Sequence, residues 1–395
     1  MQRTLNLLGI SVLALLAVGF VVLASACEAN GIRLYNNAYH FVIHQAIWLF
    51  AVAVPALLVA TFVDYHIWRR NAWLSVALYV GVCVLLCAAL GFRAINGSHR
   101  WIILGPIRLQ PSELAKIAVI IAVGVFLDRI GWRIELFKKG AMPAVCIIGV
   151  LTALTVAEPD YGSTMVIALT GFALLLVGGM KIVHFGLLGG IGAVGVLGIL
   201  ARNANRMRRI VAWLPNELAM KVSDFLSLPS VAVEDPKVEA ARYQLEMALA
   251  AIRRGGLTGV GFNKSIMKQR YLPEAHTDFI FPIGAEEWGL AFSLLLLALF
   301  VTLFACGMHI ALRAPDRLGR YLAFGATFLI FFQALFNIGV VTGCLPTKGL
   351  ALPFISYGGT NLVTALVAVG LLFNVGRQVD SYSSRPRMRR QMPSL

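Results

Sequence analysis

The sequence predicts an all-α, polytopic membrane protein, and its composition and hydropathy pattern carry that prediction. Hydrophobic residues make up 59% of the 395 residues and charged residues only 13%, whereas soluble domains usually carry about 25% charged residues. The apolar residues gather in long runs, and about 20 mainly apolar residues suffice for a helix to cross a bilayer. The net charge of +15 is spread between these runs, so it does not indicate a nucleic-acid-binding surface.

Ten apolar runs are long enough to be spanning helices. They are residues 5–25, 42–63, 73–92, 109–127, 141–157, 162–180, 183–202, 279–309, 319–343 and 352–376. The stretch from 162 to 202 is nearly continuous, and we divide it at Gly178–Lys181 because Gly-Gly-Met-Lys is typical of a turn.

The distribution of Lys and Arg orients these helices. With the N-terminus in the cytoplasm, the inside segments hold many more Lys and Arg residues than the short outside segments, as the positive-inside rule requires. Both termini are then cytoplasmic. We expect residues 1–376 to form one ten-helix membrane domain and residues 377–395 to form a basic, disordered tail near anionic lipid.

A long extracytoplasmic loop, residues 203–278, is expected between the seventh and eighth helices. Loops of this length are usually functional or disordered. Part of this one is expected to be helical, because Pro236 is suited to a first helical turn, apolar residues recur on one face, and Gly255-Gly256 would follow the end. Such a helix could lie along the membrane surface.

Charged residues inside spanning helices are rare and are candidates for a function. Glu113 and Lys116 open the fourth expected helix. Their spacing of three residues places them on one helix face, where they can form an ion pair. A structural ion pair and direct contact with a substrate both fit this pattern.

Two short outside segments carry further polar candidates. In the loop 94–102, Arg100 stands beside Trp101, so its guanidinium could bind a phosphate or anchor the loop at the membrane interface. In the turn 157–164, Asp160 is placed to cap the next helix, which leaves Glu158 as the freer acid. These two acids could also hold a divalent cation.

His276 and Asp278 immediately precede the apolar run that starts at Phe279. A carboxylate at this boundary faces a low dielectric on one side, which raises its pKa toward that of a working general base. Asp278 could equally be the N-cap of the following helix.

The segment between the last two helices is rich in Pro and Gly. Lys348 lies in its outside turn, and Ser356-Tyr357-Gly358-Gly359 is expected to interrupt the tenth helix near its outer end. Broken helices occur at membrane depth where they line a cavity. Acids, arginines and lysines thus gather on the outer side of the bundle, which suits a lipid-linked anionic substrate for either a transporter or a transferase.

Five motifs resemble those of the shape, elongation, division and sporulation (SEDS) family, to which FtsW, RodA and SpoVE belong. They are NGSHRWI, QPSELAK, EPDYGST, PEAHTDFIF and LPTKGLALPFISYGG, and they occur in the family's order between about residues 94 and 376. The last two are more similar to FtsW, the division branch, than to RodA. Trp288 and Thr360-Asn361 depart from the family pattern.

The resemblance implies an inverting peptidoglycan glycosyltransferase that polymerises lipid II outside the cytoplasmic membrane during cell division, with Asp278 as the catalytic base. The substrate-binding candidates are Arg100, Glu113, Lys116, Glu158, Asp160, His276, Lys348 and Ser356. No metal ligand is assigned, although a divalent cation, Mg²⁺ or Mn²⁺, is a candidate cofactor.

The implied partners are lipid II, the glycan linked to undecaprenyl diphosphate, a class B penicillin-binding protein and other division proteins. Three alternatives remain open at this point. They are a lipid II flippase, a polymerase of the RodA-like elongation branch, and a structural scaffold of the division complex.

Overall fold

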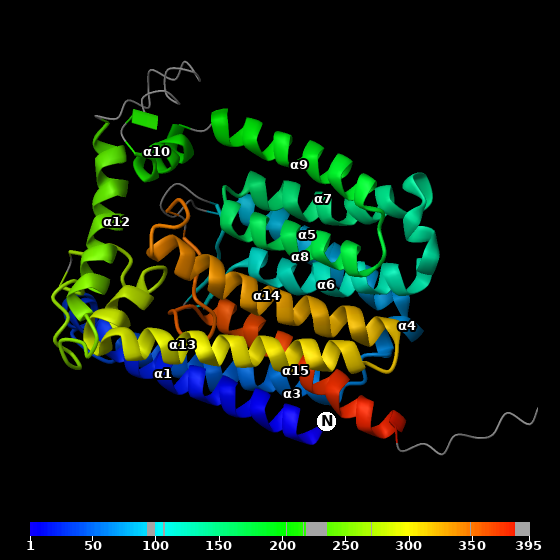
Figure 1. Ribbon diagram of the computed structural model, residues 1–395, viewed down its shortest axis with the longest axis horizontal. Helices are drawn as coiled ribbons and strands as arrows, with labels where there is room; N and C mark the ends of the chain where they lie inside the picture. The colour runs from blue at the N-terminus through cyan, green and yellow to red at the C-terminus, as the bar shows by residue number, and fades with distance from the viewer. Residues whose placement is uncertain are drawn as a thin grey trace, which may run out of the picture.

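The computed structural model describes residues 1–92, 99–105, 107–202, 204–215, 217–218, 235–269, 271–347 and 349–383. Long helices run side by side and form one elongated bundle (Figure 1). The helices are α1 (Gln2–Tyr35), α2 (His40–Trp48), η1 (Leu49–Ala53), α3 (Val54–Phe62), α4 (Ile67–Arg70), α5 (Ala72–Leu90), α6 (Pro111–Ile130), η2 (Gly131–Glu135), η3 (Phe137–Ala141), α7 (Met142–Ala157), α8 (Tyr161–Val177), α9 (Ile182–Arg202), α10 (Ala204–Trp213), α12 (Pro236–Gly255), α13 (Ile280–Arg313), α14 (Arg317–Val341) and α15 (Gly359–Ser383). Strands β1 (Ile102–Leu104) and β2 (Ile107–Leu109) form a small antiparallel hairpin ahead of α6.

Within the described residues, seven helical segments are long and apolar enough to cross a membrane. They are Gln2–Tyr35, His40–Phe62, Ala72–Leu90, Phe137–Ala157, Ile280–Arg313, Arg317–Val341 and Gly359–Val379. This confirms a mostly helical, multi-pass membrane protein. The other three expected spans coincide with α6, which carries several charges, and with α8 and α9, whose described apolar parts are shorter; the total of ten spans stays a prediction.

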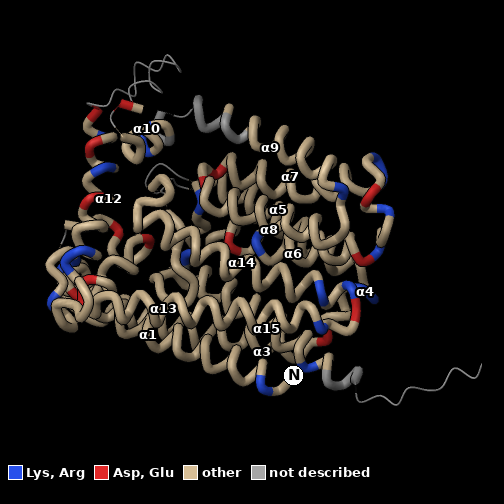
Figure 2. Tube along the Cα trace, in the orientation of Figure 1, with Lys and Arg blue, Asp and Glu red and all other residues tan. Residues whose placement is uncertain are grey.

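The charged residues are concentrated at the two ends of the bundle, and the long middle section is almost free of them (Figure 2). Large apolar side chains such as Leu13, Phe50 and Trp73 are exposed on the outer faces. A surface of this kind is stable in hydrocarbon, where the helices satisfy their own backbone polar groups. The arrangement agrees with a bundle that is surrounded by lipid.

Helix α14 lies at the centre of the part of the bundle that carries the site. It packs against α6, α8, α13 and α15, while α1 packs along α13. Asp316 begins α14 by accepting a hydrogen bond from the Gly319 amide (2.8 Å), as an N-cap residue does. The expected division between two helices at Gly178–Lys181 is confirmed, because α8 ends at Val177 and Gly179 adopts a φ of 91°.

Helix α12 crosses one end of the bundle, which we call the loop end (Figure 1). Its bounds, Pro236–Gly255, match the helix expected inside the loop 203–278, and Asp235 caps it through the Lys237 amide. Val238 and Ala248 are buried on its inner face. An ion pair of 2.8 Å joins Arg254 to Glu286 of α13, so α12 is anchored at the start of that spanning helix.

The last helix differs from the expectation at both ends. It begins at Gly359 rather than at residue 352, so Ser356-Tyr357-Gly358 precedes the helix and does not interrupt it. The physical reason is local: Phe354 has a φ of 66°, and the Ser356 hydroxyl accepts a hydrogen bond from the Leu352 amide (2.8 Å). At the other end the helix continues to Ser383, so residues 377–383 of the expected tail are helical.

Candidate functional site

Asp278 lies at the loop end, in the turn that leads into α13. Its backbone carbonyl accepts a hydrogen bond from Asn337 Nδ2 (2.9 Å), which also donates to the Leu350 carbonyl (2.6 Å). No side chain caps the first turn of α13, so the N-cap alternative for Asp278 is wrong. The carboxylate is directed at Gly349, where a Cβ atom would overlap with Oδ2.

The electrostatic surroundings of Asp278 raise its pKa to about 6. Desolvation is the main cause; Arg100 and Arg209 oppose it, while Glu274 and Asp160 act in the same direction. An ordinary aspartate has a pKa of about 3.9. Asp278 is therefore a stronger base than an exposed aspartate and still ionised above pH 6.

Arg100 acts on acids from two of the predicted segments. Its positive charge lowers the pKa of both Asp160 and Asp278. Its Nε atom is buried without a hydrogen-bond partner among the described residues. Buried donors are nearly always paired. An anionic substrate group would supply the missing acceptor, and a guanidinium fork suits a phosphate.

Asp160 caps α8, as expected, by accepting a hydrogen bond from the Ser163 amide (3.3 Å). It also accepts hydrogen bonds from Gln110 Nε2 (2.8 Å) and Ser112 Oγ (2.7 Å). Burial works to raise its pKa, but Arg100 and the hydrogen bonds from Ser112 and Ser163 outweigh that effect and hold the pKa below its usual range. Asp160 therefore stays ionised and orders the ends of α6 and α8.

Glu158 is not the freer acid that the sequence suggested, because its exposed fraction is 0%. Burial, with a contribution from Asp160, raises its pKa to about 8. The carboxyl group is thus mainly protonated at neutral pH. In the described part of the chain, no three His, Cys, Asp or Glu side chains are grouped as a metal site requires.

The Glu113–Lys116 ion pair forms as expected, with 2.7 Å between Lys116 Nζ and Glu113 Oε1. Lys116 is fully buried and also donates to Gln333 Oε1 of α14 (3.0 Å). Gln333 in turn donates to the Ala351 carbonyl (2.8 Å). This network favours the structural alternative, in which the pair holds α6, α14 and the segment before α15 together.

Ser356 and His276 belong to the segments that pack around the Asp278 turn. Ser356 is buried and donates to the Thr277 carbonyl (2.5 Å), and the Tyr357 amide donates to the His276 carbonyl (3.0 Å). Ser356 therefore supports the loop, and its contact with a substrate stays a prediction. Lys348 lies outside the described residues.

Sequence reasoning missed several residues that shape this site. Gln333 and Asn337 lie four residues apart in an otherwise apolar helix, so one face of α14 carries two amides. Polar residues in a spanning helix are a readable signal and could have identified both. Nothing in the sequence indicates that Arg209 acts on Asp278 or that Gly349 lies against it, since both depend on the folded chain.

The contact with Gly349 gives a sharp test of the site. A Gly349→Ala substitution would place a methyl group on the Asp278 carboxylate and is expected to lower turnover by about 10²-fold, since a displacement of 1 Å can have that effect. Steady-state rates of the purified protein measure it. Gly358→Ala is the matched control, because its Cβ would meet only the Asn361 Cβ at 3.6 Å; equal rates for both variants would contradict the prediction.

The fold and the site together define a multi-pass membrane protein with a carboxylate of raised pKa beside arginines at one end of its helical bundle. The chain belongs to the FtsW/RodA/SpoVE family, because the family model described as "Cell cycle protein" matches residues 6–381.

Similar proteins agree with this assignment. The "Probable peptidoglycan glycosyltransferase FtsW" of Coxiella burnetii is 34% identical over 376 residues, which cover 94% of this chain and 96% of the relative. "Stage V sporulation protein E" of Bacillus subtilis is 35% identical over 371 residues, which cover 94% and 96%. These relatives confirm the family and the enzyme class expected from the sequence.

Solved structures confirm the fold. The rod shape determining protein RodA of Thermus thermophilus superposes with a TM-score of 0.65 at 25% identity, covering 94% of this chain and 96% of RodA. A chain from a peptidoglycan synthase complex that coordinates polymerization and crosslinking gives a TM-score of 0.70 at 27% identity, covering 94% and 97%. The chain therefore has a RodA-like fold.

Proposed function

We propose that this peptidoglycan glycosyltransferase polymerises lipid II into glycan strands at the outer face of the cytoplasmic membrane, with Asp278 as its general base. The observation that carries the proposal is a half-buried carboxylate whose pKa is raised to about 6, close to arginines, in a turn held by α14 and the segment before α15. The division branch follows from the motifs PEAHTDFIF and LPTKGLALPFISYGG.

The reaction needs one proton acceptor and a stabilised leaving group. Asp278 takes the proton from the 4-hydroxyl of the lipid II GlcNAc as that oxygen attacks the anomeric carbon of the growing strand. The bond from that carbon to the undecaprenyl diphosphate oxygen breaks, the diphosphate leaves with the electron pair, and the configuration inverts. Because the diphosphate is a good leaving group, no general acid is required.

Charge stabilisation is the second task of the site. Negative charge builds on the departing diphosphate, and donors positioned for it contribute strongly where water is excluded. Arg100 is suited to this task, since it lies near Asp278 and has a buried Nε without a hydrogen-bond partner among the described residues. A divalent cation, Mg²⁺ or Mn²⁺, remains a candidate for the same task.

The raised pKa predicts the pH dependence of the reaction. The base must be deprotonated, so kcat/KM is expected to fall about tenfold per pH unit below about pH 6, the pKa of Asp278. Initial rates of lipid II polymerisation between pH 4.5 and 8, a range from about 1.5 units below the pKa to about 2 units above it, measure this. A profile that stays flat down to pH 5, about one unit below that pKa, would contradict Asp278 as the base.

Association with a class B penicillin-binding protein is part of the proposal. The similar chain from a peptidoglycan synthase complex supports it, because a transpeptidase consumes the strands that a polymerase makes. Lipid II polymerisation by the purified protein, followed on gels with and without such a transpeptidase, tests the function. Glycan strands are expected, and a complete lack of product under both conditions would contradict the proposal.

A further inference from the structure

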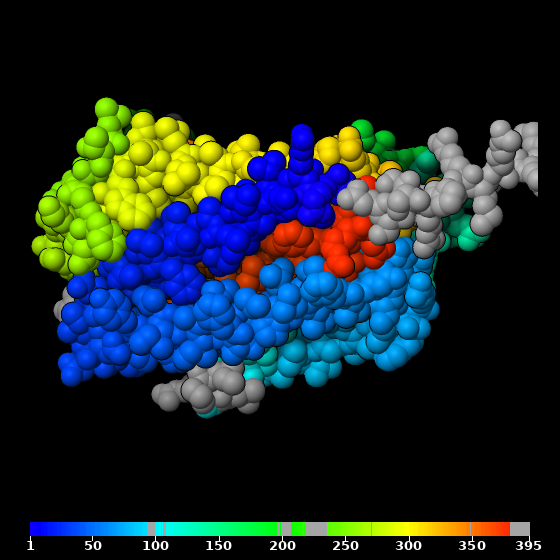
Figure 3. Space-filling model, turned by 90° about the horizontal axis from the view of Figure 1, so that it is seen from below, coloured from blue at the N-terminus to red at the C-terminus, as the bar shows by residue number. Residues whose placement is uncertain are grey.

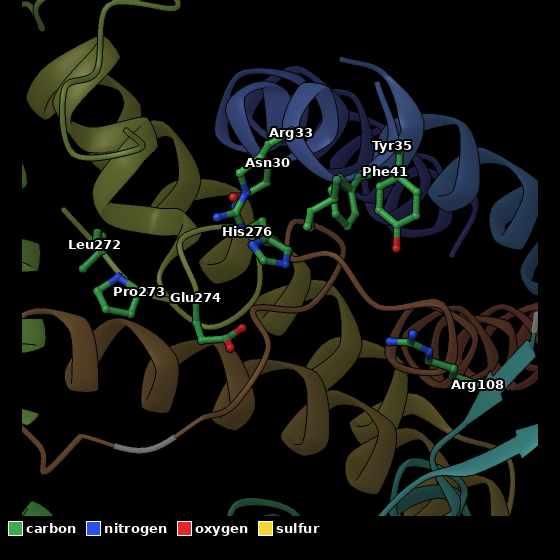
Figure 4. A pocket seen from close by; sticks show the side chains of 10 residues that line it. Asn30, Arg33, Tyr35, Phe41, Arg108, Leu272, Pro273, Glu274 and His276 are labelled. Atoms are coloured by element: carbon green, nitrogen blue, oxygen red, sulfur yellow. The ribbon is translucent and has the colours of Figure 1, made fainter. Parts of the chain in front are cut away.

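A pocket of about 460 Å³ opens at the loop end, beside the turn that carries Asp278 but without contact to that residue. It is lined by the last turn of α1, the start of α2, strand β2 and the segment that leads to Asp278 (Figure 4). Glu274 and His276 form one wall, and Arg33 and Arg108 approach from other sides. Pockets of this size accommodate a small ligand or a large polar group.

The two arginines of the pocket, Arg33 and Arg108, are exposed and can bind an anion. Arg33 lies in the last turn of α1 and Arg108 belongs to β2, and neither guanidinium forms an ion pair or hydrogen bond among the described residues. Asn30 adds an amide. Glu274 also lines the pocket, and its Oε2 accepts a hydrogen bond from Thr277 Oγ1 (2.9 Å), which fixes the position of this carboxylate.

Aromatic rings also line the pocket. Tyr35 stacks on His40 with 3.6 Å between ring centroids, and Phe41 lies 5.3 Å from the His276 ring. Beside the pocket, the outer faces of α1 and α2 expose Ile32 and Ile43. A ligand with an anionic group and an attached hydrocarbon chain can therefore place the first among the arginines and the second in lipid.

The surface below the pocket suits such a chain. Seen from below, part of α15 is visible between α1 and the α2–α3 segment in the middle of the bundle (Figure 3). Its exposed borders belong to apolar helices that face the lipid. A polyprenyl chain attached at the loop end would lie against such apolar surfaces inside the hydrocarbon region.

We propose that this pocket binds the diphosphate of one of the two lipid-linked substrates. The inference rests on the proposed function, which requires a donor and an acceptor that each carry a polyprenyl diphosphate. Arg100 can serve the diphosphate next to Asp278, and a second diphosphate needs cations of its own, which Arg33 and Arg108 supply. The segment 274–278 then separates the two anionic groups while one sugar reaches across to Asp278.

Direct binding tests the pocket without catalysis. The purified full chain in detergent is titrated with farnesyl diphosphate, a short polyprenyl diphosphate, and with farnesol as the uncharged comparison. The double variant Arg33→Gln/Arg108→Gln is expected to lose one binding site or to bind that site at least about tenfold more weakly, as expected for charged hydrogen bonds. Arg253→Gln, which removes an exposed charge from α12 at the same end, is expected to bind as the parent does.

Unchanged affinity and stoichiometry in the double variant would overturn the proposal, and so would an equal loss in the Arg253 control. Asp278→Asn should bind farnesyl diphosphate as the parent does. A variant at position 278 that polymerises normally would disprove the proposed base and leave the pocket intact, whereas normal binding by the double variant would disprove the pocket alone. The two failures are therefore distinguishable.

Two one-sided substrates identify which diphosphate enters. Lipid II with a blocked GlcNAc 4-hydroxyl can act only as donor, and lipid II with a phosphonate carbon in place of the anomeric oxygen can act only as acceptor. Their cross-reaction yields one tetrasaccharide product. The double variant is expected to raise KM about tenfold for one of them and leave the other unchanged; an equal effect on both, or on neither, would overturn the assignment.

Discussion

Replacement of Asp278 by asparagine is expected to abolish glycan strand synthesis and to leave the fold intact. Asparagine has the same shape but cannot accept the proton of an attacking hydroxyl. A positioned general base contributes about 10²–10⁴-fold, so the rate should fall by at least that range. The turn itself should persist, because Asn337 holds the backbone carbonyl at this position (2.9 Å) and not the carboxylate.

The measurement is lipid II polymerisation by the purified variant, with thermal unfolding in detergent as the check on folding. Glu246→Gln is a matched control, since it removes an exposed carboxylate from α12 at the same end of the bundle. A variant that synthesises strands at the parent rate would rule out Asp278 as the base. If instead it supported cell division without making strands, the scaffold alternative would gain support, and parent-like lipid II transport in proteoliposomes would favour a flippase.

Replacement of Lys116 by methionine is expected to cause the largest loss of stability. Lys116 is fully buried and bonds to Glu113 (2.7 Å) and Gln333 (3.0 Å). Removal of one partner from a buried ion pair leaves an uncompensated charge and costs about 3–5 kcal/mol. The network also reaches the Ala351 carbonyl through Gln333, so the segment beside Asp278 should loosen as well.

Thermal unfolding of the purified proteins measures this effect. The double variant Glu113→Gln/Lys116→Met is expected to be more stable than Lys116→Met alone, because it removes both charges. Lys237→Met serves as control, since that lysine is exposed on α12. If Lys116→Met unfolded like the parent but failed to polymerise lipid II, the pair would contact substrate and the structural interpretation would be wrong.

Much of the fold could be read from the sequence because the membrane imposes a simple pattern. Runs of about 20 apolar residues and the glycines at 178 and 179 predict helices and a turn without knowledge of tertiary contacts. The helix Pro236–Gly255 was also predictable, since Pro, an apolar face and Gly occur in the required order. The start of α15 was not predictable, because residues 352–358 are apolar enough for a span but are bent by contacts with the turn before α13.

The candidate site was only partly readable, and the reason is physical. Charged side chains at membrane boundaries identify Asp278, Arg100 and Asp160 as candidates by residue type. Burial of Glu158 and the position of Gly349 depend on packing between distant segments, which no local pattern encodes. Ser356 was predicted as a substrate ligand from the broken helix and the family motif, whereas its bonds to Leu352 and Thr277 depend on the folded chain.

The hydrogen bonds that hold the turn at position 278 are made to its backbone and not to the Asp278 side chain. Asn337 holds the main chain there, the neighbouring carbonyls of His276 and Thr277 are bound by Tyr357 and Ser356, and none of these bonds uses the carboxylate. The backbone thus holds the turn in place, and the side chain stays free for the proton transfer proposed above. A duplicated copy with another small polar residue at this position would remain a folded, membrane-embedded pseudoenzyme, separated from the working polymerase by a single codon.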